Sequence, residues 1–105
     1  MRVLITGNMG YVGPAVAKLL KQNEPTIQLI GYDAGFFGHC LTGAEATPER
    51  LYDRQYYGDT REFPAELLCG VDAVVQLAAI SNDPMGKEFE EVTAAVNRVA
   101  SVRFA

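Results

Sequence analysis

The stretch that decides the fold of this chain is Thr6-Gly7-Asn8-Met9-Gly10-Tyr11-Val12-Gly13, which follows directly on the apolar run Val3-Leu4-Ile5. Glycines at every third position between a strand and a helix predict a tight strand–turn–helix unit. Such a turn brings bare backbone N–H groups to the positive end of a helix dipole, which suits an anion such as a pyrophosphate. A turn that only packs the helix on the strand is the plainer alternative, since glycine tolerates positive φ. The flanking strand and helix favour phosphate binding, through backbone more than side chains.

A second apolar run, Ile27 to Tyr32, ends in Asp33, twenty residues after Gly13. An acid at this offset is what a dinucleotide site uses to bind the ribose hydroxyls of its cofactor. A solvated acid at a strand end is the alternative, but the glycine turn favours the ribose role.

The charge of Asp33 also bears on the choice of cofactor. At about 4 Å and an effective dielectric near 20, it would repel a unit charge on a 2′-phosphate by about 4 kcal/mol. No Arg or Lys lies between Gly31 and Glu49 to offset this repulsion. We therefore expect NAD rather than NADP, an inference that Arg50 or Arg54 would weaken by folding back.

Size, charge and composition indicate one small domain without a nucleic-acid or membrane partner. The chain has 105 residues, 49% of them hydrophobic, and a net charge of −4, whereas binding to a nucleic-acid backbone needs a basic face. Cys40 and Cys69 have no metal-ligand or CxxC spacing, which favours reduced thiols. Met1 to Ile5 enters a strand at once, and no apolar run approaches the roughly 20 residues of a membrane span, so we expect a cytoplasmic chain.

Strand and helix patterns alternate along the chain. Strands are predicted at 3–5, 27–32, 55–58 and 71–79, and helices after the glycine turn as far as Asn23-Glu24-Pro25, over 63–68, and from Phe89 to the end. Long loops are predicted at 34–49 and 80–86. This alternation predicts βαβ units and a parallel sheet.

Five motifs follow one another in the order and spacing of a known family. They are Thr6-Gly7-x-x-Gly10-Tyr11-x-Gly13, Asp33, Gly58-Asp59-x-Arg61, Leu77-Ala78-Ala79 and Asn97-x-x-Ala100-Ser101. Together they resemble the extended short-chain dehydrogenases/reductases, the NAD(P)-dependent epimerases and dehydratases that act mostly on nucleotide sugars. The resemblance covers the whole chain but only the opening portion of the family.

The resemblance implies a Rossmann-type α/β half-domain over residues 1–105, with four parallel strands in the order 3-2-1-4. The cofactor would lie across the strand ends, with pyrophosphate on Gly10 to Gly13 and adenosine towards Asp33 and Asp59. The predicted cofactor-binding residues are Gly7, Asn8, Met9, Gly10, Tyr11, Val12, Gly13, Asp33, Asp59, Thr60, Leu77, Ala78 and Ala79.

Two of these motifs have equally simple structural interpretations. Asp59 matches the family acid that approaches the adenine amino group, but Asp also suits a helix cap, and one side chain can do both. Leu77-Ala78-Ala79 matches the stretch that passes beside the cofactor, and it also reads as the small-residue end of a buried strand.

Other polar and aromatic residues carry weaker hypotheses. Ser81-Asn82-Asp83 lies where open α/β sheets bind ligands, but a plain surface loop is favoured. Asn97 resembles the family asparagine beside the active site, or is a polar residue on a solvated helix face. His39-Cys40 is too small a set for a metal site. Phe36 and Phe37 are interpreted as loop anchors rather than adenine covers, and solvated first-turn acids are expected at Glu88, Glu90 and Glu91.

The chain departs from the family in its catalytic residues. Family catalysis uses a Tyr-x-x-x-Lys pair aided by Ser or Thr, and no tyrosine of this sequence has a lysine four residues later. We therefore expect a cofactor-binding portion without the sugar domain, with no catalytic residue of its own, which meets a nucleotide sugar only in the intact protein. The alternative is a non-catalytic dinucleotide sensor.

The fourth strand is expected to lack its usual neighbour, a fifth strand, and so to leave an open edge. An open apolar edge invites pairing with another chain. We therefore expect self-association through this edge and marginal stability.

Overall fold

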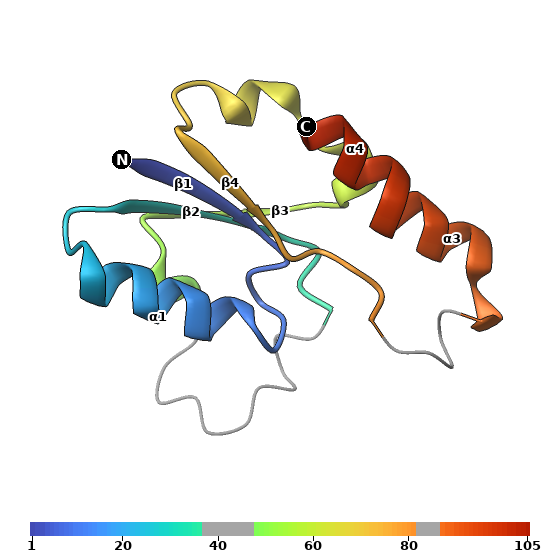
Figure 1. The fold of residues 1–105 in the computed structure, drawn as a ribbon, viewed down its shortest axis with the longest axis horizontal. Helices are drawn as coiled ribbons and strands as arrows, with labels where there is room; N and C mark the ends of the chain where they lie inside the picture. The colour runs from blue at the N-terminus through green and yellow to red at the C-terminus, as the bar shows by residue number, and fades with distance from the viewer. Residues whose placement is uncertain (37–47, 82–86) are drawn as a thin grey trace.

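Four parallel strands form one sheet in the computed structural model, which describes residues 1–36, 48–81 and 87–105 (Figure 1). The strands are β1 (Arg2–Thr6), β2 (Gln28–Asp33), β3 (Arg54–Tyr57) and β4 (Ala73–Gln76), in the order β3-β2-β1-β4. Leu4 of β1 pairs with Ile30 of β2 and with Val74 of β4. The parallel sheet and the strand order predicted from the sequence are confirmed.

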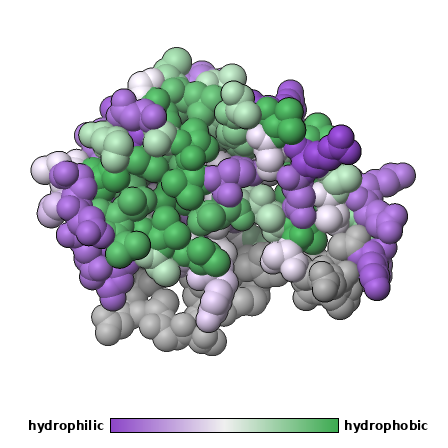
Figure 2. Space-filling view, viewed as in Figure 1, coloured by the Kyte–Doolittle hydropathy of each residue, from purple (hydrophilic) through white to green (hydrophobic). Residues whose placement is uncertain are grey.

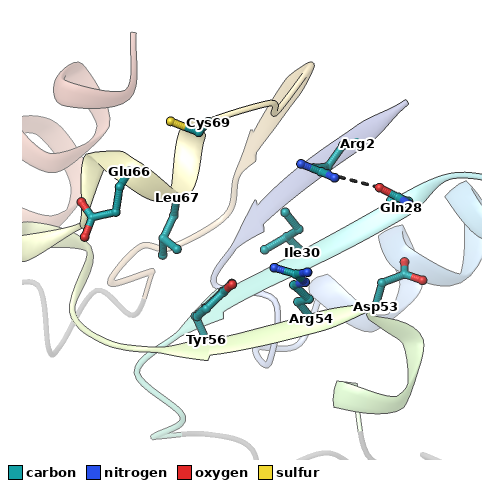
Figure 3. Close-up of a pocket in the computed structure, with 9 residues that line it drawn as sticks. All are labelled: Arg2, Gln28, Ile30, Asp53, Arg54, Tyr56, Glu66, Leu67 and Cys69. Carbon is teal, nitrogen blue, oxygen red and sulfur yellow. Dashed lines mark hydrogen bonds between the residues drawn. The ribbon is translucent and has the colours of Figure 1, made fainter.

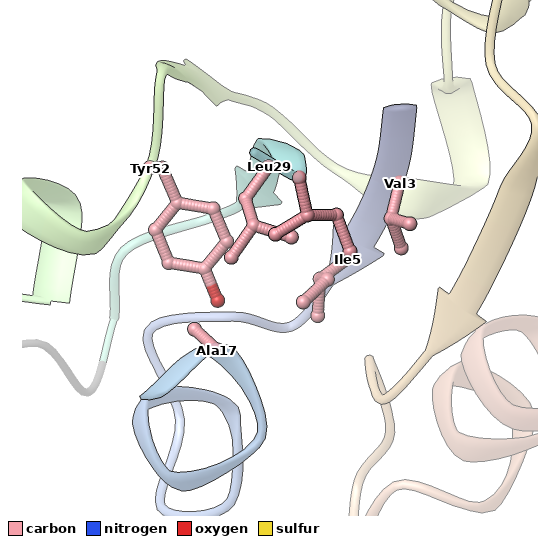
Figure 4. Close-up of a cluster of buried hydrophobic side chains, with 6 residues drawn as sticks. Val3, Ile5, Ala17, Leu29 and Tyr52 are labelled. Carbon is pink, nitrogen blue, oxygen red and sulfur yellow. The ribbon is translucent and has the colours of Figure 1, made fainter. Parts of the chain in front are cut away.

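Helix α1 (Gly13–Asn23) covers one face of the sheet (Figure 1). Pro14 lies in its first turn, where N–H groups lack intrahelical partners, and the helix ends at Glu24, whose N–H donates to Leu20 O at 2.9 Å. Ala17 is fully buried against the sheet. The core under this helix consists of Val3, Ile5, Ala17, Ile27, Leu29 and Tyr52 (Figure 4).

The other face is covered by the last part of the chain (Figure 1). This part consists of α3 (Glu90–Ala94), the π-helix η5 (Ala95–Ala100) and α4 (Ser101–Phe104). Phe63 joins this layer to the sheet, with ring centroids 4.7 Å from Tyr32 and 4.8 Å from Phe104. Helical layers on both faces of a parallel sheet are the Rossmann arrangement.

Asp53 and Lys21 fasten the end of α1 to the sheet. Asp53 Oδ2 accepts hydrogen bonds from the Leu29 N–H at 2.7 Å and from Lys21 Nζ at 2.9 Å. The bond from Lys21 is the main cause that lowers the pKa of Asp53, and the Leu29 N–H adds to it. The last turn of α1 is therefore tied to the start of β2 and of β3.

Element boundaries differ from the sequence predictions where proline or a strand end intervenes. The helix predicted over 63–68 is only the 3-10 helix η4 (Ala65–Leu68), and a separate 3-10 helix, η3 (Thr60–Glu62), precedes it, because Pro64 disfavours helical backbone at Phe63. β4 is shorter than the predicted 71–79, and β3 begins one residue before the predicted 55. The predicted loop 34–49 lies largely outside the described residues, and η2 (Pro48–Leu51) is a further 3-10 helix.

No helix within the three described ranges combines the length and the apolar character needed to cross a membrane.

Tyr52 offers a test of the core beneath α1. Its hydroxyl is buried without a hydrogen-bond partner among the described residues, and burial raises its pKa. We expect Tyr52→Phe to leave the free energy of unfolding unchanged or to raise it by up to about 1 kcal/mol, because no bond is lost. Urea denaturation measures this.

Tyr32→Phe is the matched control, because Tyr32 is also a buried tyrosine and its hydroxyl donates to Asp59 O at 3.3 Å. Its loss should lower the free energy of unfolding by about 1 kcal/mol. A larger loss for Tyr52→Phe than for Tyr32→Phe would contradict the placement of the Tyr52 hydroxyl.

Candidate functional site

The glycine-rich turn lies at the carboxyl edge of the sheet, at the point where the strand order reverses. Thr6, the last residue of β1, pairs with Tyr32 on one side and with Gln76 on the other. The chain leaves β1 through α1 towards β2, whereas β4 lies on the opposite side of β1. In open α/β sheets ligands bind in the crevice at such a switch point.

Two of the three glycines in the turn are required by the close approach of the backbone. Gly7 has a φ of +67°, and a Cβ there would lie 2.5 Å from Ala78 N. A Cβ at Gly13 would lie 2.2 Å from Asn8 O. A Cβ at Gly10 would lie 3.3 Å from Gly7 O, which is a tight contact but a single one, so Gly10 is less crowded than Gly7 or Gly13.

The amide groups at the head of α1 are available to a ligand. Gly7 N–H donates to Tyr32 O at 2.8 Å and Gly10 N–H to Gly7 O at 3.1 Å. The next three amides, those of Tyr11, Val12 and Gly13, have no acceptor among the described residues, and no side chain caps the helix. Tyr11 and Val12 expose their side chains, by 90% and 54%. Such unsatisfied N–H groups at a helix dipole attract an anion.

Asp33 lies against this turn. Its Oδ2 accepts from the Met9 N–H at 2.9 Å, and its Oδ1 accepts from the Gly35 N–H at 2.7 Å. These two bonds fix the orientation of the carboxylate at the end of β2. Each oxygen retains lone-pair capacity for another donor, such as a hydroxyl group.

Asp59 caps the helix that follows it, and its contact with a ligand remains a prediction. It accepts from the Arg61 N–H at 2.8 Å and from Arg61 Nε at 2.9 Å, and this pairing lowers the pKa of Asp59. Gly58 N–H donates to Asp33 O at 3.0 Å, so Asp59 and the buried Thr60 follow on the same edge of the sheet.

The stretch Leu77-Ala78-Ala79 runs directly beside the turn. Leu77 N–H donates to Thr6 O at 3.1 Å, and Ala78 N–H contacts Thr6 Oγ1 at 3.4 Å. The Thr6 hydroxyl also bonds the side chain of Gln76. The end of β4 is therefore held against the glycine turn by backbone and side-chain contacts together.

Asn97 is exposed, which agrees with its interpretation as a polar residue on a solvated helix face, but its side-chain amide also bonds to the backbone. Asn97 Oδ1 accepts from the Ile80 N–H at 2.8 Å, and Asn97 Nδ2 donates to Ile80 O at 2.9 Å. The last helical layer thus holds the segment that leaves β4. This contact had no signal in the sequence beyond the family resemblance.

Several weaker hypotheses find little support or fall outside the described residues. Phe36 is 74% exposed, so its interpretation as a loop anchor is wrong. Ser81 is exposed, whereas Phe37, His39-Cys40 and Asn82-Asp83 lie outside the described ranges. Within those ranges no three His, Cys, Asp or Glu side chains could hold a metal ion. The first helical turn of α3 does carry the exposed acids Glu90 and Glu91.

Sequence reasoning missed the buried polar side chains beneath the turn. Asn8, expected to act through its backbone, is fully buried and bonds the side chain of Gln55 in β3. The two residues are 47 positions apart, so only the register of β3 against β2 brings them together.

The fold is of the Rossmann type: a parallel sheet in the order β3-β2-β1-β4, with a glycine-rich turn at the head of α1 and an acid at the end of β2. The chain belongs to the NAD dependent epimerase/dehydratase family, whose model matches residues 3–105. No curated protein matches it in sequence.

Solved structures of similar fold include three sugar-nucleotide epimerases. UDP-glucose 4-epimerase from Stenotrophomonas maltophila, solved with NAD and formylated UDP-arabinopyranose, is 23% identical over 97% of this chain and 31% of its own, with a TM-score of 0.73. UDP-glucuronic acid 4-epimerase from Bacillus cereus, in complex with NAD, is 23% identical over 95% of this chain and 33% of its own, with a TM-score of 0.73.

UDP-glucose 4-epimerase from Thermotoga maritima, solved with UDP-glucose, is 20% identical over 97% of this chain and 32% of its own, with a TM-score of 0.76. The chain therefore spans about a third of the length of these structures.

Substitution of Gly13 and of Gly10 by alanine should change the free energy of unfolding by different amounts. We expect Gly13→Ala to lower the free energy of unfolding by about 2 kcal/mol or more, because the new methyl group would overlap the Asn8 backbone. Gly10→Ala should cost less, about 1 kcal/mol, because its new methyl group would meet only Gly7 O, at 3.3 Å. Urea denaturation of both variants measures the difference, and equal losses would contradict the backbone geometry described for the turn.

Proposed function

We propose that this chain forms the NAD-binding part of a nucleotide-sugar epimerase or dehydratase. The observation that carries the proposal is the pairing of open amides at the head of α1 with a carboxylate fixed beside them by the Met9 N–H. A dinucleotide carries a negatively charged pyrophosphate next to a ribose diol, and these two groups match the two features of the site.

The proposed pose places the pyrophosphate on the turn and the adenosine along the strand ends. The amides of residues 11–13 would bind the pyrophosphate, which would lie beside Gly10, where no side chain intervenes. Asp33 would accept hydrogen bonds from the ribose hydroxyls. The adenine would extend towards Asp59 and Thr60, with Leu77 to Ala79 lining the path through backbone and small side chains.

The surroundings of Asp33 support NAD over NADP. Arg54 was one residue able to offset the repulsion of a 2′-phosphate, and it begins β3, where it is in register with Ile30, whereas Asp33 ends β2. Its side chain lines a cavity of about 190 Å³ that also includes Arg2 and Gln28, which begin β1 and β2 (Figure 3). Among the described residues the ion pairs are Lys21–Asp53 and Arg61–Asp59, so neither Arg50 nor Arg54 forms one with Asp33.

The division of chemistry follows from the residues present. A bound nicotinamide cofactor supplies hydride transfer to and from a sugar carbon. The residues of this chain would bind and orient it, and no Tyr-x-x-x-Lys pair is available here for proton transfer. Residues 1–105 would thus act as an NAD-binding half-domain of a protein whose nucleotide-sugar site is completed by further residues.

Calorimetric titration of NAD into the chain tests the proposal. We expect binding that weakens about tenfold or more in Asp33→Ala, because hydrogen bonds to a charged acceptor are lost. NADP should bind the unmodified chain more weakly than NAD, and Asp33→Ala should narrow that difference, because the repulsion is removed.

Glu66→Ala is the matched control, since Glu66 is an exposed acid of η4 that lines the cavity at the amino ends of the strands. It should leave the NAD affinity unchanged. Absence of binding heat, or an affinity unaffected by Asp33→Ala, would reject the cofactor assignment for this chain.

We further propose that the chain associates with a second copy through β4. Among the described residues β4 pairs only with β1, and its residues are half-buried or exposed, whereas β1 is almost wholly buried. Hydrophobic residues gather on the face where β4 and α1 lie (Figure 2). Val75 and Leu77 are half-buried and pack against the core under α1, as do Val16 and Leu20 of that helix.

Sedimentation velocity over a concentration series tests this association. We expect the mean mass to rise with concentration, and Ala73→Lys to suppress the rise, because a charge on a strand edge opposes pairing. Ala65→Lys adds the same charge to an exposed alanine of η4 and should not change the association. A monomer at all concentrations, with one cooperative thermal transition, would count against it.

A further inference from the structure

A pair of side-chain amides, the fully buried Asn8 and the half-buried Gln55, joins the glycine-rich turn to β3. Asn8 Nδ2 donates to Gln55 Oε1 at 2.7 Å, and Gln55 Nε2 donates back to Asn8 Oδ1 at 3.2 Å. Asn8 is fully buried, so neither bond from its amide exchanges easily with water. Buried hydrogen bonds of this kind are strong when complete and costly when one partner is missing.

β2 leaves room for this pair at Gly31. A Cβ at Gly31 would lie 2.2 Å from Gln55 Oε1 and 2.4 Å from Asn8 Nδ2. Gln55 is in register with Gly31, and its Nε2 also donates to Tyr56 O at 3.0 Å, which fixes the side chain to its own strand. Three segments of the chain are therefore fitted around one polar contact.

Asn8 lies between two residues of the turn whose amides hold the ligand site together, so the pair can affect the shape of that site. The preceding amide, Gly7 N–H, is bonded to Tyr32 O, and the following one, Met9 N–H, is bonded to Asp33. The carbonyl of Asn8 packs against Gly13, where α1 begins. A shift of Asn8 would therefore move both the contact with Asp33 and the head of the helix.

We propose that the Asn8–Gln55 pair is a positioning element that keeps the glycine-rich turn in its ligand-binding shape before any ligand arrives. The ligand is the pyrophosphate-bearing dinucleotide, and for that identity the inference rests on the proposed function. If the turn is ordered before the ligand binds, the free energy of binding contains no entropic cost of ordering the turn, and the affinity is higher. Neither side chain touches the ligand in this account, since both lie beneath the turn.

The first test needs no ligand. Amide hydrogen exchange followed by NMR compares Met9 with Leu4 in the unmodified chain, in Asn8→Ala and in Gln55→Ala. We expect the protection of Met9 N–H to fall by a larger factor than that of Leu4, because its bond to Asp33 depends on Asn8. General destabilisation would lower both protections by a common factor.

The second test measures the NAD affinity of the same variants. We expect either single substitution to weaken NAD binding roughly three- to tenfold. The double variant should bind no more weakly than the single variants, because each substitution removes the same contact between Asn8 and Gln55. Gln28→Ala, a glutamine of β2 that bonds Arg2 at the opposite end of the sheet, should bind as tightly as the unmodified chain. If Asn8→Ala does not fold, Gln55→Glu keeps the volume and removes the donated bonds.

The outcomes separate this inference from the proposed function. Failure of the unmodified chain to bind NAD rejects the proposed function, and the exchange measurement still decides whether the pair orders the turn. Unchanged relative protection of Met9 in the folded variants overturns the positioning role. Unchanged NAD affinity in variants whose Met9 protection has fallen also overturns it.

Discussion

The site depends on a backbone that passes so close to itself that side chains are excluded. Gly7 lies against the backbone of Ala78, and Gly13 lies against that of Asn8. These two contacts bring the end of β1, the path of β4 and the start of α1 into one small volume at the edge of the sheet. At the head of α1 that results, the amides of Tyr11, Val12 and Gly13 have no acceptor within the part of the chain that the structure describes.

Asp33 places a carboxylate beside the amides of this turn, so the candidate site contains both hydrogen-bond donors and an acceptor. A turn with free amides alone binds an anion of many kinds. The carboxylate at the end of β2 adds an acceptor of defined orientation, because Met9 and Gly35 each donate a backbone hydrogen bond to it. In the proposed pose, the distance between the pyrophosphate on the turn and the ribose hydroxyls on Asp33 would be set by these backbone contacts.

The sequence predicted the parts of this structure that depend on local pattern. The glycine turn and the apolar strands follow from periodicity and spacing, the order of the sheet was implied by the family resemblance, and Asp59 occupies the cap position that its residue type favours. Pairings of residues distant in sequence were not predictable in this way. The bond between Asn8 and Gln55 depends on the register of β3, and that between Asn97 and Ile80 on the packing of the last helical layer. The broken helix around Pro64 was readable, because the residue before a proline avoids helical backbone.

The absence of a side chain at Gly31 leaves the space that the side chains of Asn8 and Gln55 occupy, so these three positions constrain one another. Any larger residue there would occupy the space of the Asn8 and Gln55 amides. A relative with a larger residue at position 31 should therefore have smaller side chains at positions 8 and 55. A relative without the amide at either position can accept a larger residue at position 31. Relatives of this chain should accordingly change these three positions together, as correlated substitutions spanning 47 residues of sequence.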